Sequence, residues 1–369
     1  MKKTVCICCL LLLLGALAPF AAAQSWTPNG PLPRFLHTAV FDPSTKQMII
    51  YGGFSPTSNT MQGYDADVWR LLPSASLAGP QNWAALRPTG TPPAPRGAHL
   101  AGYDPGSNRM VLFGGITANE CVNDTWVITN ANGIGGQSAW LQLSPIGGPP
   151  GVRSYMGGAY DPMSNTLLVY GGLDCFTITY RDFWVLSHAN GLGGTPTWKQ
   201  LFPTGGPGPL DAFTMVYDPN TNELILFSGG SNGVFNNNVW ILTNANGTGG
   251  TPAWNQLFPI GGPPASRFGS SATYDPASNR MTIFGGQGSA GTFLGDVWVL
   301  TNANGTGGTP AWTQIAQSST VYPAPRYGHT AAYDASRNVM IVFGGEIYSN
   351  YPIDLATNDV FFLSDANGQ

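Results

Sequence analysis

Five arginines recur at one position of a repeated pattern and could bind an anion together. Each stands eighteen residues before a glycine pair that ends an apolar stretch. They are Arg34, Arg96, Arg153, Arg267 and Arg326, and Asp211 takes the position in the remaining repeat. A guanidinium group matches a carboxylate or a sulfate with two parallel hydrogen bonds. Two hypotheses follow: the arginines bind an acidic ligand, or each bonds carbonyls and acids of its own chain.

Three of the four histidines keep a fixed distance from these arginines. His37, His99 and His329 each lie three residues after one of them. A metal site needs ligands that converge within a few ångströms, and equivalent positions of separate repeats do not converge unless they point at a common axis. We therefore expect packing histidines, and we expect neither a metal nor another cofactor.

Two of the five cysteines lie outside the apolar N-terminal stretch. Cys121 and Cys175 follow the first glycines of the second and third pairs by seven and four residues. A pair of cysteines in an exported protein often forms a disulfide. We expect a Cys121–Cys175 bond that joins two neighbouring loops, with two free thiols as the alternative.

The N-terminus has the pattern of a secretory signal peptide. A basic "MKK" precedes an apolar run, and "AAAQ" offers a cleavage site after Ala23. We expect a secreted or periplasmic protein, a single domain over residues 24–369, and no segment inserted in a membrane. Without Lys2 and Lys3 the chain has 13 basic and 19 acidic residues, a net charge of −6. That balance argues against nucleic acid as a partner.

Short strands must position these residues. Charged residues make up only 9% of the chain, which contains 49 Gly and 31 Pro. Aromatic residues make up 12%, and disordered segments are poor in them. The glycines and prolines are therefore expected in the tight turns of an all-β protein.

Six repeats organise the chain after the signal peptide. Each contains an aromatic-Asp turn, an apolar run ending in a glycine pair, and an aromatic strand such as "DVWVL". The glycine pairs begin at residues 52, 114, 171, 229, 285 and 344. In five repeats a second Trp follows the aromatic strand's Trp by fourteen residues. The pattern predicts four strands in each repeat, which we name a to d in chain order.

An apolar strand that ends in Gly-Gly, followed by a Trp-bearing strand, resembles the kelch repeat. The resemblance covers essentially all of residues 24–369 and implies a six-bladed β-propeller of four-stranded antiparallel blades. Kelch adaptor domains carry Arg at the position of the five arginines and hold acidic peptides with it, so the resemblance implies the same for this set. We expect a monomer.

The chain ends in the middle of a repeat. The last residues, "VFFLSDANGQ", supply strand c of the sixth repeat but no strand d. The segment "QSWTPNGPLPR" precedes the first strand a and contains Trp26. We expect this segment to complete the sixth blade, so that no sheet edge stays open. The alternative is a frayed N-terminus beside an incomplete blade.

The loops from strand b to strand c vary most in length and share one face with the starts of the a strands. The two longest, residues 54–67 and 346–359, belong to neighbouring blades and mix tyrosines with acids. Loops of this kind often carry function, although long insertions are also tolerated without a ligand. Our prediction is non-catalytic binding of a protein or a glycan that could be acidic. Its expected contacts, besides the arginines, are Tyr64, Asp65, Tyr348 and Tyr351.

Enzymatic alternatives have weaker support in the residues. Galactose oxidase shares the propeller type, but the Tyr, His and Cys group of its copper site is not recognisable here. The sialic acid mutarotase is a secreted six-bladed kelch protein, and ring opening of a sugar needs an acid and a base. Glu120 and Glu346 lie in strand b to strand c loops and could serve, whereas Glu223 lies in a turn on the other face. The mutarotase type is therefore our alternative prediction.

Overall fold

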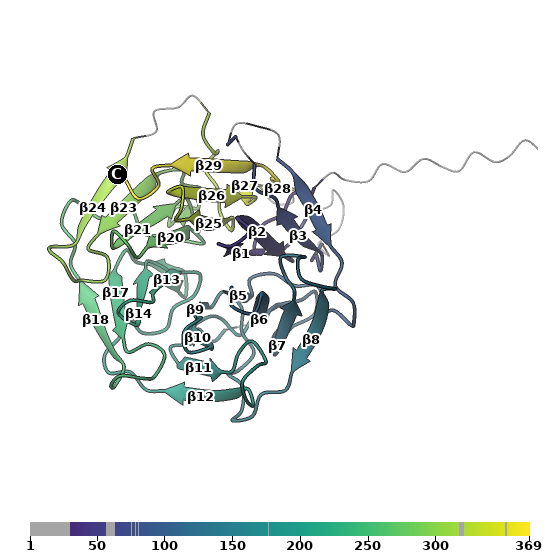
Figure 1. Ribbon diagram of the computed structural model, residues 1–369. Helices are drawn as coiled ribbons and strands as arrows, with labels where there is room; N and C mark the ends of the chain where they lie inside the picture. The colour runs from purple at the N-terminus through teal and green to yellow at the C-terminus, as the bar shows by residue number, and fades with distance from the viewer. Residues whose placement is uncertain are drawn as a thin grey trace, which may run out of the picture.

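The computed structural model describes residues 30–56, 63–74, 76, 77, 79, 81–175, 177–316, 321–350 and 353–369. In this part of the chain all regular elements are β-strands, and six sheets stand around a central axis like the blades of a propeller (Figure 1). The predicted all-β, six-bladed fold is confirmed. Within the same residues, no helix has the length and apolar character needed to cross a membrane.

The blades follow one another in chain order. Blade 1 consists of β1 (Thr38–Asp42), β2 (Gln47–Tyr51), β3 (Val68–Leu71) and β4 (Trp83–Leu86). Blade 2 consists of β5 (Leu100–Asp104), β6 (Arg109–Ile116), β7 (Cys121–Thr129) and β8 (Ala139–Leu143). Blade 3 consists of β9 (Gly157–Asp161), β10 (Thr166–Tyr170), β11 (Phe183–Ser187) and β12 (Thr197–Leu201).

The second half of the ring repeats this plan. Blade 4 consists of β13 (Thr214–Asp218), β14 (Glu223–Phe227), β17 (Val239–Thr243) and β18 (Ala253–Leu257). Blade 5 consists of β20 (Ser271–Asp275), β21 (Arg280–Phe284), β23 (Val297–Thr301) and β24 (Ala311–Ile315). Blade 6 consists of β25 (Thr330–Asp334), β26 (Val339–Phe343) and β29 (Val360–Ser364).

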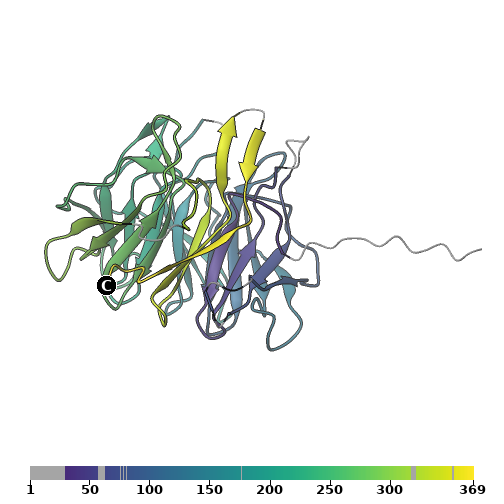
Figure 2. The ribbon, with the colours of Figure 1, turned by 90° about the horizontal axis from the view of Figure 1, so that it is seen from above.

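Short strands occur in three loops from strand b to strand c. Two of these loops form hairpins, β15 (Gly230–Ser231) with β16 (Val234–Phe235) and β27 (Glu346–Asn350) with β28 (Ile353–Ala356). In the third, β22 (Gln287–Gly288) pairs with β19 (Arg267–Phe268), which precedes strand a of the same blade. The β27–β28 hairpin projects from one face of the ring (Figure 2). We call this face, which bears the strand b to strand c loops, the b–c face.

Every strand in a blade pairs with its neighbours antiparallel, and the first strand of each blade is innermost (Figure 1). Five blades have four strands, as predicted, and the sixth sheet has three within the described residues. Residues 24–29 of the segment expected to complete it, Trp26 among them, lie outside the described residues.

The cores lie between the blades, where the second strand of each blade is almost completely buried. The strand d Trp of each blade packs on the aromatic residue that ends strand b of the preceding blade, with ring centroids 4.8–5.1 Å apart. The pairs are Trp83 on Phe343, Trp140 on Tyr51, Trp198 on Phe113, Trp254 on Tyr170 and Trp312 on Phe227. Burial of large aromatic rings dominates the energetics of such cores.

A closed circle of backbone hydrogen bonds surrounds the axis near the b–c face. One residue of each blade donates its N–H to the matching carbonyl of the preceding blade, at 2.7–3.0 Å. The donors and acceptors are Leu36 to Gly328, Ala98 to Leu36, Tyr155 to Ala98, Ala212 to Tyr155, Gly269 to Ala212 and Gly328 to Gly269. All six residues have φ between 49° and 63°, a region that costs non-glycine residues on the order of 1 kcal/mol or more. The circle therefore joins all blades, including blades 1 and 6.

The repeated "ANG" phrase has a structural role on the opposite face. Its Asn donates Nδ2–H to the Asp of the aromatic-Asp turn in the preceding blade, at 2.6–2.9 Å. The pairs are Asn132 to Asp42, Asn190 to Asp104, Asn246 to Asp161, Asn304 to Asp218 and Asn367 to Asp275. The C-terminal "DANGQ" thus ties blade 6 to blade 5. Between blades 1 and 6 an ion pair from Lys46 to Asp334, at 3.7 Å, takes the place of this bond.

Candidate ligand-binding face

The five recurrent arginines are buried structural residues. Each is at most 1% exposed and forms a two-pronged ion pair with the Asp two residues before the strand c aromatic, with Nη1–Oδ1 distances of 2.5–2.7 Å. The Nε–H of each arginine donates to the carbonyl of the residue two positions earlier. The Nη1–H also donates to the carbonyl of the first glycine of the pair in the same blade. The acids are Asp67, Asp124, Asp182, Asp296 and Asp359.

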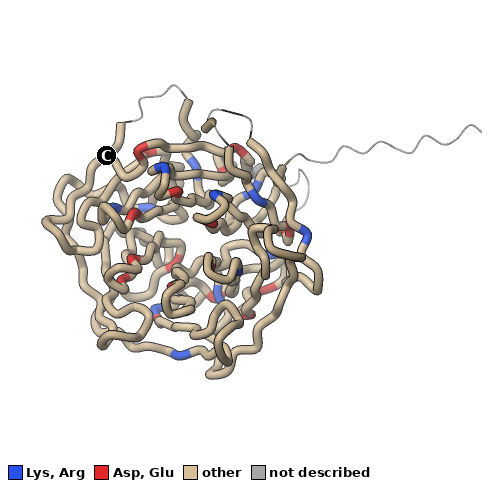
Figure 3. The backbone as a smooth tube through the Cα atoms, in the orientation of Figure 1, with Lys and Arg blue, Asp and Glu red and all other residues tan. Residues whose placement is uncertain are grey.

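These contacts bear on the hypothesis that the arginines bind an acidic ligand. An acidic ligand would have to displace Asp124, for example, to reach Arg96. Burial alone would raise the pKa of Asp124, but the hydrogen bonds and charge of Arg96 hold it below its usual value. The same carboxylate accepts the indole N–H of Trp126 at 2.7 Å. Of the two hypotheses for the arginines, the geometry supports the structural one. Figure 3 shows the few charged residues spread around the ring.

In blade 4 the residue at the arginine position is Leu210, one residue before the Asp211 that the sequence pattern indicated. Gly172 N–H donates to the carbonyl of Leu210, whereas Gly115 N–H donates to that of Arg153. Leu210 therefore stands at the arginine position, and Ser228 (φ 66°) stands at the first glycine position. Asp211 lies one residue later, among the residues that begin strand a at the b–c face.

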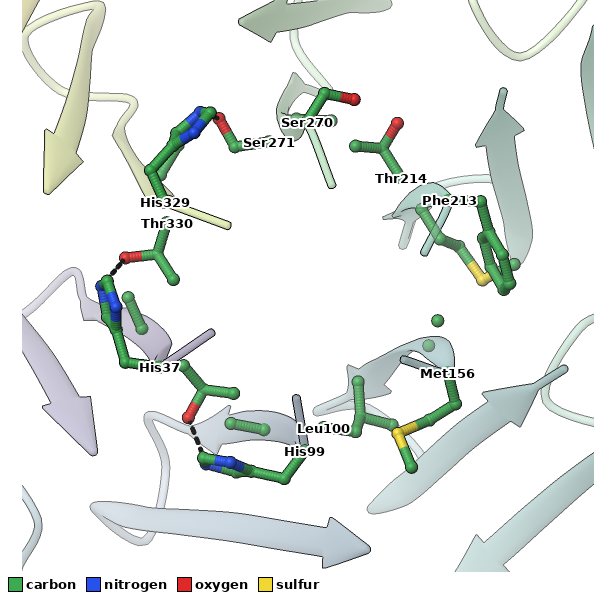
Figure 4. A pocket seen from close by; sticks show the side chains of 18 residues that line it. His37, His99, Leu100, Met156, Phe213, Thr214, Ser270, Ser271, His329 and Thr330 are labelled. Atoms are coloured by element: carbon green, nitrogen blue, oxygen red, sulfur yellow. Dashed lines mark hydrogen bonds between the residues drawn. The ribbon is translucent and has the colours of Figure 1, made fainter. Parts of the chain in front are cut away.

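The three histidines connect neighbouring blades beside the central channel (Figure 4). The Nε2 atom of His99 is hydrogen-bonded to Thr38 of the preceding blade at 2.7 Å, and its ring lies edge-on to Tyr51, 5.2 Å between centroids. His37 bonds Thr330 and His329 bonds Ser271 in the same way, at 2.7 and 2.8 Å. Met156, Phe213 and Ser270 take this position in the other blades. The arrangement supports a packing role.

Burial sets the charge state of these histidines. Burial, together with the charge of the neighbouring arginine, lowers the pKa of His99 and of His329 to about 3. Burial also lowers the pKa of His37 well below its usual value. All three are therefore neutral at physiological pH. They border a channel cavity of ≈ 220 Å³. Among the described residues no group of three His, Cys, Asp or Glu side chains is placed to hold a metal ion.

A continuous row of aromatic rings lies on the b–c face, and we call it the aromatic shelf. It consists of Tyr64, Phe54, Phe35, Tyr327, Phe268 and Phe235, with Phe293 beside Tyr327. Successive rings lie 4.6–6.4 Å apart between centroids. Most of these rings are half-buried, and none belongs to the cores between blades.

Polar groups of blades 3, 4 and 6 adjoin this shelf. The phenols of Tyr155 and Tyr327 act on each other's pKa, and the charges of Asp211 and Glu346 raise the pKa of both. Burial raises the pKa of Tyr155 to about 12, so its hydroxyl stays a donor at physiological pH. Burial also raises the pKa of Asp211, against a weak hydrogen bond of 3.4 Å from Thr179. Among the described residues no salt bridge includes Asp211.

The four loop residues predicted to contact a ligand lie in different environments. Tyr64 belongs to the shelf, with its ring on Phe54. Asp65 faces inward: it lies 3.5 Å from Arg34 and accepts the hydroxyl of Ser55. Tyr351 and the side chain of Tyr348 lie outside the described residues. Three shelf residues that the sequence analysis did not select, Phe35, Phe268 and Tyr327, directly follow the arginine of their blade, so an aromatic residue at that position was an available signal.

The two glutamates of the enzymatic alternative lie in different settings. Glu346 begins β27, is 6% exposed and acts on the Tyr155–Tyr327 pair. Glu120 is exposed in the turn between β6 and β7, where its carbonyl accepts bonds from Thr117. The mutarotase type stays a prediction.

Cys121 and Cys175 form the predicted disulfide, with 5.7 Å between their Cα atoms. Cys121 begins β7 in blade 2, and Cys175 lies in the loop after β10 in blade 3. The bond therefore joins neighbouring loops on the b–c face, in agreement with the prediction.

Comparisons with known proteins agree with the repeat pattern. Residues 248–367 match the family model of the KLHDC2/KLHL20/DRC7 Kelch-repeats domain. An F-box/kelch-repeat protein of Arabidopsis thaliana is 25% identical over 340 residues, which are 86% of this chain and 67% of that protein. A putative adagio-like protein 2 of Oryza sativa subsp. japonica is 27% identical over 219 residues, which are 56% of this chain and 32% of that protein.

The solved structure of YjhT shares the architecture. Its TM-score is 0.63 at 15% identity, and the match covers 90% of this chain and 95% of that chain. At this identity the likeness shows the fold alone. This chain spans about a third of the rice relative. The repeats, the blades and these matches together support a kelch-repeat domain built as a six-bladed propeller.

Proposed function

We propose that this kelch-repeat propeller is a non-catalytic binding module whose ligand docks on the aromatic shelf of the b–c face. The observation that carries the proposal is the row of seven half-buried or nearly buried aromatic rings outside the cores. Five of the rings are partly exposed, and aromatic residues supply much of the binding energy at protein interfaces. Kelch propellers generally bind proteins, which favours a polypeptide over a glycan.

The charge of the site shapes the proposed ligand. The arginines are neutralised by their own aspartates, whereas Asp211 has no such counter-ion among the described residues. We therefore propose a ligand that is neutral or basic where it meets Asp211, in place of the acidic ligand expected from the sequence. The predicted signal peptide and the disulfide support a role outside the cytoplasm.

Alanine substitutions in the shelf test the proposal. A peptide and glycan array first identifies a binder, and its affinity is then measured for a Tyr64→Ala, Phe293→Ala double variant. We expect affinity to fall at least tenfold, because two ring contacts are lost. The matched control replaces Phe202 and Phe258, which are 76% and 78% exposed beyond β12 and β18. Equal affinities of the shelf variant and the unmodified protein would refute the proposed site.

A further inference from the structure

A cavity of ≈ 390 Å³ lies at the seam between blades 3 and 4. Arg181 and Asp182 line it directly before β11, and Trp254 lines it from β18 of blade 4. Most of the remaining lining comes from residues 200–208, which leave β12, the outermost strand of blade 3 (Figure 1). This volume falls in the range of small-molecule sites, roughly 300–1,000 Å³.

The connection that forms one wall of the cavity differs from its counterparts. It takes twelve residues from the strand d Trp to the arginine position, Trp198 to Leu210, and at least thirteen in the other blades. In those blades the carbonyl two residues before the arginine accepts its Nε–H. Blade 4 lacks the arginine, and the carbonyl of Gly208 instead accepts the phenol of Tyr170 at 2.7 Å. The shorter connection is therefore fastened to blade 3.

Arg181 brings a positive charge to this cavity. Its side chain is exposed, and among the described residues it forms no ion pair. The adjacent carboxylate of Asp182 is already bound by both Nη atoms of Arg153, at 2.7 and 2.8 Å, and by the indole N–H of Trp184. Burial and the charge of Asp182 raise the pKa of Tyr170, and the charge of Arg181 opposes this rise. The guanidinium group therefore acts on the wall of the cavity.

The corresponding position in the other blades shows that the scaffold does not need an arginine there. In blades 2, 4 and 6 the residue is Asn123, Asn237 or Asn358, which donates Nδ2–H to a proline carbonyl ahead of the next blade at 2.9–3.1 Å. Blades 1 and 5 have Ala and Gly at this position. Arg181 therefore replaces a residue that bonds neighbouring blades, or a small one, by a long cation beside a cavity.

An aromatic ring and several polar groups adjoin this charge. Phe202 lines the cavity and is largely exposed. Gln200 and the backbone of Gly205 and Gly206 add polar groups to the lining. A purely aromatic acid would leave these groups without partners, at a cost in affinity. A sugar ring offers an apolar face to Phe202 and hydroxyls that both donate and accept hydrogen bonds.

We propose that this cavity binds a sugar that carries a carboxylate, of the hexuronic acid class. Its carboxylate would pair with Arg181 through two parallel hydrogen bonds, and its ring would stack on Phe202. None of the residues that line the cavity belongs to the aromatic shelf. The inference therefore does not depend on the ligand proposed for the shelf.

Titration of the full chain with galacturonate and glucuronate, each compared with its neutral hexose, tests the site. Arg181→Asn should lower the affinity for the acid at least tenfold, because a charge-assisted pair is lost. Its stability in urea should match the parent, since three blades carry Asn naturally. Phe202→Ala should also weaken binding, whereas Phe258→Ala, an exposed ring at the same position of blade 4, is the control. Equal affinity of the parent and Arg181→Asn, equal affinity for acid and neutral sugar, or no binding of either acid would overturn the proposal.

Amide chemical shifts of the unmodified protein keep the test decisive if a variant does not fold. We expect the acid that binds more tightly to shift the amides of Gly205, Gly206 and Gly208, and we expect added salt to weaken its binding. The Tyr64→Ala, Phe293→Ala variant should bind this acid as the parent does, which separates failure of this site from failure of the shelf. Benzoate that binds as tightly as the acidic sugar, or shifts confined to the shelf, would contradict the proposal.

Discussion

Mild acid should destabilise this protein through its three buried histidines. His37, His99 and His329 are neutral in the folded state because burial depresses their pKa. In the unfolded chain each titrates near pH 6.5. Between pH 6.5 and the depressed folded values the unfolded state binds more protons than the folded state. The free energy of unfolding therefore falls as pH falls through this window.

The size of the effect follows from the linkage relation. From pH 7.5 to pH 5.5, one histidine with an unfolded pKa near 6.5 and a much lower folded pKa lowers the free energy of unfolding by about 1.4 kcal/mol. Three independent histidines lower it by about 4 kcal/mol. Carboxylates with depressed folded pKa, such as Asp124 and Asp182, act below their unfolded pKa near 4 and so outside this range.

Urea unfolding of the parent and of a His99→Met variant at both pH values would measure this dependence. Methionine is the natural residue of blade 3 at this position, Met156, so the variant keeps an apolar packing group. We expect the pH effect to shrink by about a third in His99→Met, since one of three titrating groups is removed. His188→Asn, which restores the residue that most other repeats carry, is the control. An unfolding free energy that does not change between pH 7.5 and 5.5 in the parent would refute the reasoning.

Three further predictions concern the bonds within and between blades. Arg96→Ala should lower the free energy of unfolding, measured with urea, by about 3 kcal/mol or more, because it leaves the partly buried Asp124 without its cation. The double variant Arg96→Leu, Asp124→Asn copies the residues that blade 4 carries naturally and should lower it clearly less. Asn367→Ala should cost on the order of 1–3 kcal/mol, since it removes a buried hydrogen bond between blades, and a fully stable variant would deny that role. Replacing Cys121 and Cys175 by Ser should cost about 4 kcal/mol by loop entropy over their 54-residue separation; no change in unfolding would show that the bond does not constrain the chain.

The scaffold could be predicted from the sequence because its features recur from repeat to repeat. The repeat pattern predicted four strands in each repeat, its resemblance to the kelch repeat implied six blades, and the cysteine positions predicted the disulfide. The role of the arginines could not be chosen from the sequence, because each partner Asp stands 28–33 residues later in the chain. That Asp stands two residues before a strand c aromatic in five repeats. Blade 4, which lacks both the arginine and this Asp, provides the sequence signal that the two residues act together.

The binding face could not be predicted in the same way, because it depends on what differs between repeats. Phe35, Phe268 and Tyr327 occupy one repeat position and join into a single row only when blades 1, 5 and 6 are placed in the ring. Asp211 lies on this face because it occupies the same repeat position as Phe35 and Tyr327, directly after the arginine position. Blade 4 thus lacks the ion pair of the scaffold at Leu210 and, one residue later, carries a carboxyl group beside the shelf that has no counter-ion among the described residues. The double variant Leu210→Arg, Asn238→Asp restores the arginine–aspartate pair in blade 4, keeps Asp211, and should leave the affinity for the ligand unchanged. Asp211→Asn should weaken the binding of basic ligands and leave the binding of neutral ligands unchanged.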